Sequence, residues 1–285
     1  MVVDVAVTAE SALAAAAARL KSAGITDARR EAARLAEAAW GVEPGQARLH
    51  AGRIIPVERL DRLAAMVERR AAGEPLAYLA GVVGFRRLTL VSDARALIPR
   101  PETEGLVDLV LERMPAGVVA DVCTGSGCIA LALAQEGRYD RVIGTDCSGE
   151  ALALARENGK AAGLAVEWRQ GDLVAPLAGE RLDVLVANPP YLTSAEHAAL
   201  DRSVAAWEPA LALESGADGL DATRRLVADA LPLVKPGGWL ALEVDCERAA
   251  AVAALAAGSG WNGPAVYRDL FGRARYVLAR RSETS

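Results

Sequence analysis

The chain contains few aromatic, histidine and cysteine residues, and each shortage argues against a class of site. Aromatic side chains make up 4% of the 285 residues, so Ala, Leu and Val must fill the core that a 52% hydrophobic chain can bury. His50 and His197 are the only histidines, which argues against a His-rich metal site and a Ser–His triad. The four cysteines form no Cys-x-x-Cys pair and no disulfide spacing, as is typical of a reduced cytoplasmic protein: Cys123, Cys128, Cys147 and Cys246. We therefore predict no bound metal and a cytoplasmic location.

An excess of basic residues is also absent. The 32 Lys and Arg residues against 37 Asp and Glu give a net charge of −5, whereas a general nucleic-acid binder carries a basic face. No apolar run approaches the length of a membrane span, and Met1-Val2-Val3-Asp4 lacks the basic start of a signal peptide. We predict a protein that works away from membranes and makes no sequence-specific contacts with nucleic acid.

Residues 1–75 have the period of helices. One helix is predicted from Thr8 to Ala23, where Gly24 follows, and a second from Asp27 to Trp40, where Gly41 follows. A third begins at Pro56, because proline suits the first helical turn, and it carries four apolar residues at helical spacing: Val57, Leu60, Leu63 and Val67. We predict a small helical bundle over residues 1–80.

The period changes at residues 82–91, where alternating apolar residues predict a hairpin within a linker at 81–98. From residue 99 to the end, strand patterns alternate with helical ones. This alternation predicts an α/β domain with a mainly parallel sheet and helices on both faces. A last antiparallel pair is expected at 266–267 and 275–279. The other predicted strands are 118–122, 141–145, 165–169, 182–187 and 238–244.

Asn188-Pro189-Pro190-Tyr191 directly follows one of these strands. The two prolines end the strand and fix the backbone where it leaves the sheet, at the carboxyl edge where open α/β sheets bind ligands. The Asn188 side-chain oxygen and the Pro189 carbonyl can both accept hydrogen bonds from one planar NH2 group, and the Tyr191 ring offers a flat face. The tetrapeptide is a candidate binding site for an amide or an exocyclic amine. The alternative is a proline-rich turn with a surface tyrosine.

A glycine-rich turn follows the first strand of the sheet, and its residues are Cys123, Thr124, Gly125, Ser126 and Gly127. Its glycines let the backbone turn tightly and approach a ligand. The next strand ends in Asp146, which is placed as the acid that binds a ribose diol. A further strand ends before Asp172, a second acid at the same edge. These three strand ends together predict a nucleotide-type site, whereas a glycine turn with two solvated acids is the alternative.

The dinucleotide fingerprint would place a third Gly near position 130, which is Ala, a residue that the motif also permits. The turn has no Gly-Lys-Ser/Thr ending, so a P-loop is excluded. S-adenosylmethionine fits best, because its ribose needs the acid and it has no phosphates. The Asn188 tetrapeptide on a later strand decides between this cofactor and NAD.

With these motifs, the chain resembles the HemK/PrmC family of class I S-adenosylmethionine-dependent methyltransferases. These enzymes methylate the side-chain amide of the glutamine in the Gly-Gly-Gln motif of peptide chain release factors. The resemblance covers nearly the whole chain, and the Pro-Arg-Pro-Glu-Thr-Glu segment at 99–104 separates this family from most amine methyltransferases. The distinctive stretches are 73–78, 97–104, 121–127, 188–191, 208–213, 216–220 and 235–238.

The resemblance implies a helical N-terminal domain that helps dock the release factor and a Rossmann-like domain of seven strands. It implies that the glycine turn, Asp146, Asp172 and Leu173 surround the cofactor, together with Asn188. Cys123 stands where the family often has Gly, and Leu173 stands where an aromatic residue sometimes lies beside the adenine. We expect a monomer whose partners are class 1 release factors.

The residues favour one mechanism. Asn188 and the Pro189 carbonyl would hold the substrate amide, Tyr191 would pack on its plane, and Pro190 and Arg100 would shape the mouth of the site, although Arg100 could equally pin the hairpin. Three other functions stay open: a glutamine methyltransferase for a ribosomal protein, an adenine-N6 nucleic-acid methyltransferase, and a binding module without activity. The intact 99–104 segment favours the release factor.

Overall fold

The computed structural model describes residues 7–200 and 206–283, and the chain divides into two compact units. The first unit contains the N-terminal helices up to Val82. The second runs from Val83 to Leu200 and continues from Glu208. Each unit has its own hydrophobic core, so each is described separately.

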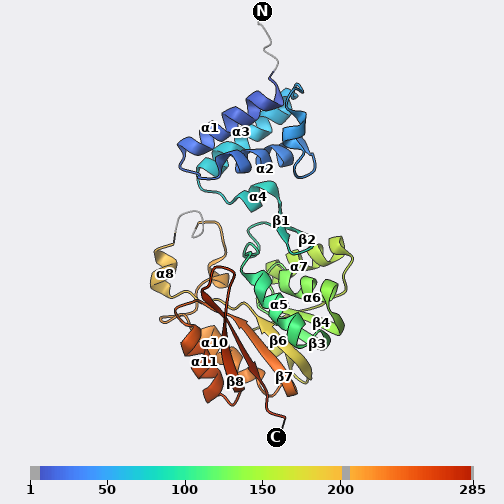
Figure 1. Cartoon of the computed structure of the whole chain (residues 1–285), viewed down its shortest axis with the longest axis vertical. Helices are drawn as coiled ribbons and strands as arrows, with labels where there is room; N and C mark the ends of the chain where they lie inside the picture. The colour runs from blue at the N-terminus through green and yellow to red at the C-terminus, as the bar shows by residue number, and fades with distance from the viewer. Residues whose placement is uncertain (1–6, 201–205, 284–285) are drawn as a thin grey trace, which may run out of the picture. The chain divides into compact units, whose positions relative to one another are not determined.

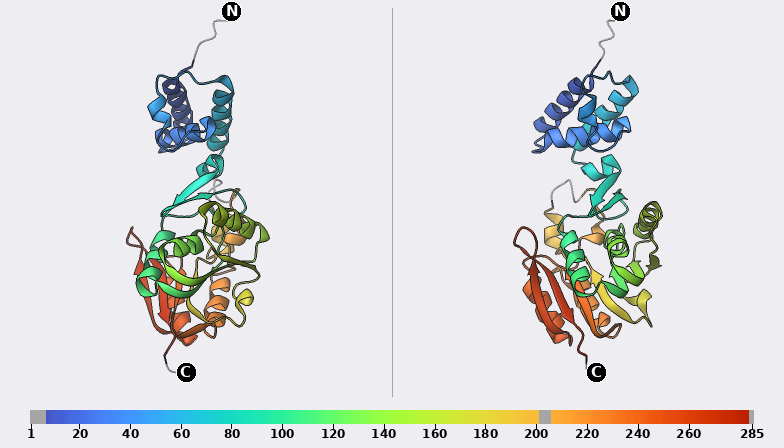
Figure 2. Two further views of the ribbon diagram at one scale, coloured as in Figure 1. Left: turned by 90° about the vertical axis from the view of Figure 1, so that its right-hand side faces the viewer. Right: turned by 45° about the vertical axis from the view of Figure 1, so that its right-hand side comes forward.

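The first unit is a bundle of α1 (Ala9–Ser22), α2 (Ala28–Trp40) and α3 (Val57–Ala71), which Figure 2 shows in blue and cyan. The helices end where the sequence predicts: the Thr8 side chain caps α1, and Gly41 at φ 65° follows α2. Two short helices complete the unit: η1 (Ala47–His50) lies between α2 and α3 in the chain, and α4 (Leu76–Ala80) comes after α3. Of the four apolar residues at helical spacing on α3, Leu63 and Val67 enter the core, whereas Val57 in the first turn is 62% exposed.

The predicted hairpin forms from β1 (Val82–Phe85) and β2 (Leu88–Val91). Phe85, Leu88 and Leu90 are buried in the same cluster as the helices of the sheet domain. Arg86 turns the chain at φ 52° and donates hydrogen bonds to both oxygens of Glu136, at 2.6 and 2.9 Å. The hairpin is therefore held to the second unit by packing and by an ion pair.

The second unit is built on a seven-stranded sheet with the order β5-β4-β3-β6-β7-β9-β8, so the predicted Rossmann-like fold is confirmed. Strands β3 to β7 are parallel, and β9 pairs antiparallel with β7 and with β8. Strand order reverses between β3 and β6, which makes this the point where such sheets bind ligands. The strands are β3 (Ala116–Val122), β4 (Arg138–Asp146), β5 (Glu167–Gln170), β6 (Leu182–Ala187), β7 (Val234–Glu243), β8 (Asn262–Arg268) and β9 (Ala274–Arg280).

Helices cover both faces of this sheet (Figure 1). On one face, α5 (Thr103–Arg113) and α6 (Cys128–Glu136) pack against the strands, and α7 (Gly149–Ala162) packs beside β4 and β5. On the other face lie α10 (Asp221–Ala230) and α11 (Ala249–Gly258). The short helices η2 (Ala175–Leu177), α8 (Ser194–Ala198) and η3 (Ala210–Ala212) occupy connections. Within the described residues, no helix has the length and apolar character needed to cross a bilayer.

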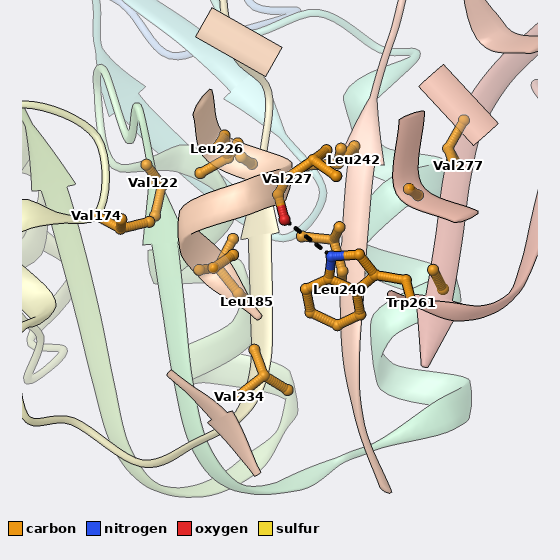
Figure 3. Packing of buried hydrophobic residues seen from close by; sticks show 14 of the residues in the cluster. Val122, Val174, Leu185, Leu226, Val227, Val234, Leu240, Leu242, Trp261 and Val277 are labelled. Atoms are coloured by element: carbon orange, nitrogen blue, oxygen red, sulfur yellow. Dashed lines mark hydrogen bonds between the residues drawn. The ribbon is translucent and has the colours of Figure 1, made fainter. Parts of the chain in front are cut away.

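Trp261 fills the core beneath α10 and α11, as Figure 3 shows. It is 3% exposed, and its indole N–H donates to the Val227 carbonyl at 2.9 Å. A buried indole usually needs such a partner, because an unpaired N–H away from water costs free energy. Trp261 therefore joins α10 to the chain that enters β8, in a core whose other buried residues are Leu, Val, Ile and Ala.

We expect Trp261→Ala to lower the free energy of unfolding by roughly 3–5 kcal/mol, because a large buried side chain leaves a cavity. Urea unfolding followed by circular dichroism measures this loss. Phe271→Ala is the matched control: Phe271 is 66% exposed, so its loss should stay within about 0.5 kcal/mol. Equal losses for the two variants would contradict this assignment of the core.

Candidate active site

A cavity of about 380 Å³ opens at the carboxyl edge of the sheet, within the second unit. Its wall brings together most of the residues that the sequence singled out: Arg100, Cys123, Thr124, Gly125, Ser126, Asp146, Asp172, Leu173, Asn188 and Pro190. Gly127, Pro189 and Tyr191 do not line it. The three strand ends that the sequence groups together therefore line one cavity.

The glycine turn joins β3 to α6 in a tight loop. Gly127, at φ 83°, donates its N–H to the Thr124 carbonyl at 2.8 Å. A Cβ there would come within 2.8 Å of the Trp168 ring, so this position needs glycine both for its φ and for its packing. Cys123 also has a left-handed φ of 59°, although it is not glycine. This strained backbone explains why the resembling family often has Gly at that position.

Asp121 lies beneath the turn and is fully buried. Its Oδ2 accepts hydrogen bonds from the Thr124 hydroxyl at 2.5 Å and from the Ala130 N–H at 3.1 Å, while Oδ1 has no partner among the described residues. Burial raises the pKa of this carboxyl to about 7. Asp121 thus ties the glycine turn to the first turn of α6 from below.

Asp146 ends β4 and is held from two sides. Its Oδ2 accepts the Gly125 N–H at 2.9 Å, and its Oδ1 accepts the Ser148 N–H at 2.9 Å. A carboxylate has about four acceptor positions, so two remain for a ligand in the cavity. Asp146 is therefore fixed in place and can still bind a diol.

Asp172 and Leu173 follow β5 and meet the cavity differently. Asp172 forms an ion pair with Arg225 of α10, and both side chains are more than half exposed. Leu173 is 9% exposed at φ 45°, and its carbonyl accepts from the Thr145 hydroxyl at 3.2 Å. Leu173 supplies an apolar wall, whereas Asp172 lies at the solvent side.

Asn188 follows β6 and is half-buried at the cavity wall, where its Nδ2 donates to the Thr103 hydroxyl oxygen at 3.5 Å. Tyr191 continues the segment, and its N–H donates to the Leu213 carbonyl at 3.2 Å. Burial raises the pKa of its phenol to about 12, so Tyr191 stays neutral at ordinary pH. The tetrapeptide is thus an ordered part of the domain and not a surface turn.

Arg100 is fixed by Glu208, a buried carboxylate that the motif stretches contain but to which the sequence assigned no role. Arg100 Nη2 donates to Glu208 Oε1 at 2.5 Å, and the Ile98 N–H donates to Oε2 at 3.2 Å. One carboxylate therefore anchors the segment before α5 at two points. The sequence also missed Thr103 and Arg225 as wall residues, because each depends on an element far away in the chain.

All three arginines of the cavity wall are engaged by carboxylates: Arg95 pairs with Asp93 and Glu157, Arg100 with Glu208, and Arg225 with Asp172. Each guanidinium that lines the cavity among the described residues therefore already has a carboxylate partner. Burial also raises the pKa of the Cys123 thiol well above its usual value and that of Cys128 to about 12. Both are neutral thiols that pack. Within the described ranges, no three His, Cys, Asp or Glu residues gather as a metal site would require.

Comparison with known proteins agrees with this geometry. Residues 11–81 match the PrmC N-terminal domain and residues 103–208 match the methyltransferase small domain. A release factor glutamine methyltransferase from Deinococcus radiodurans is 43% identical over 95% of this chain and 97% of its own. One from Cereibacter sphaeroides is 42% identical over 95% and 98%. A methyltransferase structure from Pyrococcus furiosus shares the fold, with a TM-score of 0.53 at 15% identity over 78% of this chain and 98% of its own. The identities over nearly the full length show that this chain belongs to the HemK/PrmC family of release factor glutamine methyltransferases.

Proposed function

We propose that this protein transfers the methyl group of S-adenosylmethionine to the side-chain amide nitrogen of the glutamine in the Gly-Gly-Gln motif of class 1 release factors. One observation carries the proposal: Asn188, the glycine turn and Asp146 line a single cavity. Relatives that are 42–43% identical over 95% of this chain are named release factor glutamine methyltransferases. Such a protein would work in the cytoplasm, and we expect it to act as a monomer.

The cavity fits the cofactor in three respects. Asp146 keeps acceptor positions that could take the ribose hydroxyls, the glycine turn would let the ligand lie close to the backbone, and Leu173 would give the adenine an apolar neighbour. When bound, S-adenosylmethionine supplies an electrophilic methyl group on a sulfonium sulfur.

The substrate amide must be held by acceptors, because its nitrogen is a poor nucleophile whose lone pair is delocalised into the carbonyl. Asn188 Oδ1 would accept one of its N–H groups and aim the nitrogen at the methyl group. The Pro189 carbonyl would be the second acceptor, although Pro189 is not among the residues that line the cavity. Pro190 and Arg100 form the neighbouring wall, and neutral Tyr191 packs beside them. Positioning of this kind can contribute roughly 7–11 kcal/mol to lowering the barrier.

A transfer assay with labelled S-adenosylmethionine tests the function. We expect label on the Gly-Gly-Gln glutamine of an unmodified class 1 release factor, and none on ribosomal protein or on DNA offered under the same conditions. Peptide mapping by mass spectrometry locates the label. Preferential labelling of a ribosomal protein or of adenine in DNA would replace the proposed substrate.

Asp146→Ala should weaken cofactor binding, because the ribose diol loses a charged acceptor, and a hydrogen bond to a charged group contributes roughly 1.5–3 kcal/mol. Isothermal calorimetry with S-adenosylmethionine measures the change. Asp140→Ala is the control, because Asp140 lies on β4 but away from the cavity wall. Unchanged affinity in a folded Asp146→Ala protein would remove this residue from the cofactor site.

Asn188→Ala should nearly abolish methyl transfer at saturating release factor and cofactor, because it removes an acceptor aimed at the reacting amide; loss of one such transition-state contact costs about 100-fold or more. Cofactor affinity should change less. Stopped-assay measurements of kcat, with calorimetry for the cofactor, separate the two effects. If the variant keeps most of its turnover, the orientation mechanism is wrong.

We further propose that residues 1–80 dock the release factor, with 81–98 as the linker to the catalytic domain. A fragment starting at Val82 should then bind S-adenosylmethionine normally but methylate an intact release factor poorly, since remote binding energy is expressed at the chemical step. Methylation of a short Gly-Gly-Gln peptide should change little. Comparing both substrates with both proteins tests this, and equal losses on peptide and protein would show that the bundle supports the active site instead.

A further inference from the structure

Glu243 is a buried carboxylate that no step above uses. It is the last residue of β7, and the pairing of Leu242 with Ala187 places it alongside Asn188 at the same edge of the sheet. It is 2% exposed, and its Oε2 has no hydrogen-bond partner among the described residues. It does not line the cavity, so it can act on a ligand only through a neighbour.

Thr103 is that neighbour. It is the first residue of α5, it is 2% exposed, and it lines the cavity together with Asn188. Its hydroxyl oxygen accepts from Asn188 Nδ2 at 3.5 Å, and its hydroxyl lies close enough to the Glu243 carboxyl to favour the charged form of that carboxyl. The three side chains thus form a cluster that runs from the core to the cavity wall.

The direction of these bonds follows from the donors available. An ionised carboxylate only accepts, and a threonine hydroxyl has one hydrogen. Thr103 must therefore donate to ionised Glu243, which leaves its oxygen as an acceptor toward Asn188. Asn188 then turns its NH2 group to Thr103 and its Oδ1 to the cavity. An amide turned the other way would present NH2 to the NH2 of a substrate amide, and two donors repel.

We propose that Glu243 is a positioning residue which, through Thr103, holds the Asn188 amide with its oxygen toward the substrate, and that protonation of Glu243 releases this orientation. The proposal rests on the glutamine methyl transfer proposed above and assigns a further residue to the same site. A protonated Glu243 can donate to Thr103. The hydroxyl hydrogen is then free to point at Asn188 Oδ1, which allows the unproductive orientation.

The surroundings of Glu243 place its titration near neutral pH. Burial raises the pKa of Glu243 to about 7, because the charged form loses its water. The Thr103 hydrogen bond, Arg275 of β9 and Arg100 favour the charged form, whereas Glu102 opposes it. The other titratable groups that face it are neutral side chains from three elements: Tyr191, Tyr276 and Cys128.

The test is the pH dependence of kcat on a short Gly-Gly-Gln peptide at saturating S-adenosylmethionine, from pH 5.5 to 8.5. Since the ionised form is the productive one, wild-type kcat should fall as pH drops below about 7 and level off about tenfold lower, where the Asn188 orientation is no longer enforced. Glu243→Gln should remove this fall of kcat at low pH, which is the acid limb of the profile. The reason is that a glutamine can donate or accept at every pH. The plateau of this variant should lie about tenfold below the wild-type plateau, since the Asn188 orientation is no longer enforced.

Thr103 variants test the connection itself. Thr103→Val should reduce kcat and flatten the limb as Glu243→Gln does, and the double variant should be no slower than Thr103→Val alone, because both act through one chain. Thr103→Ser keeps the hydroxyl and should keep the wild-type profile. Glu136→Gln, on α6 and paired with Arg86 away from the cavity, should keep the limb as well. Melting temperature and cofactor affinity of each variant confirm that the protein is folded.

Asp121 is the competing group, because its pKa also lies at about 7. Its titration would change cofactor affinity and would survive in Glu243→Gln, so a limb that persists there overturns the proposal. Additive losses in the double variant overturn it too. If Glu243→Gln does not fold, the pH profiles of Thr103→Val and Thr103→Ser decide: the proposal fails if Thr103→Val keeps the wild-type profile. Wild-type protein that labels neither peptide nor release factor removes the proposed function itself, whereas an active wild type with a persistent limb removes only the role of Glu243.

Discussion

The register of the parallel strands is the constraint on which the rest of the site depends. Val122 at the end of β3 pairs with Thr145 of β4 and with Ala187 of β6, and Ala187 pairs with Leu242 of β7. The next residue after each of these paired positions is Cys123, Asp146, Asn188 or Glu243, so backbone pairing alone brings the four to one edge. Because side chains alternate along a strand, a slip of one residue would turn each of them to the other face. The chemistry of the site is therefore specified by the core that fixes this register.

Two buried carboxyl groups at the site make the stability of the fold depend on pH. Burial raises the pKa of Asp121 and Glu243 to about 7, above the value of about 4 for the unfolded chain. The stability that comes from their protonated forms is fully present below about pH 4 and is lost as pH rises through 7. The protein thus becomes less stable in the range where ionised Glu243 is useful. Such a cost is typical of functional sites and is hard to explain by packing alone.

The sequence predicted the elements that local patterns encode. Each predicted strand and each helix stop was found, and the site residues that follow strands were placed at one edge because topology alone implies it. It could not predict ion pairs that join distant segments, such as Arg100 with Glu208, 108 residues away. Nor could it separate the residues that line the cavity from those that do not: Gly127, Pro189 and Tyr191 are not in its wall, and Glu243 carried no signal beyond its place in the predicted strand at 238–244. These distinctions depend on side-chain burial, which the spacing of residues does not determine.

The cavity also contains two strained positions that local propensity disfavours. Cys123 and Leu173 both have left-handed φ angles, at 59° and 45°, and such positions cost roughly 1–3 kcal/mol each. The neighbours of Cys123 hold it there: the Thr124 N–H donates to the Thr145 carbonyl at 2.9 Å, and the Gly125 N–H donates to Asp146. Glycine at 123 would remove the strain but would add freedom to the turn in the unfolded chain. The cysteine therefore adds local strain but makes the turn less flexible in the unfolded chain. The hydrogen bonds to β4 stabilise the strained backbone at this position.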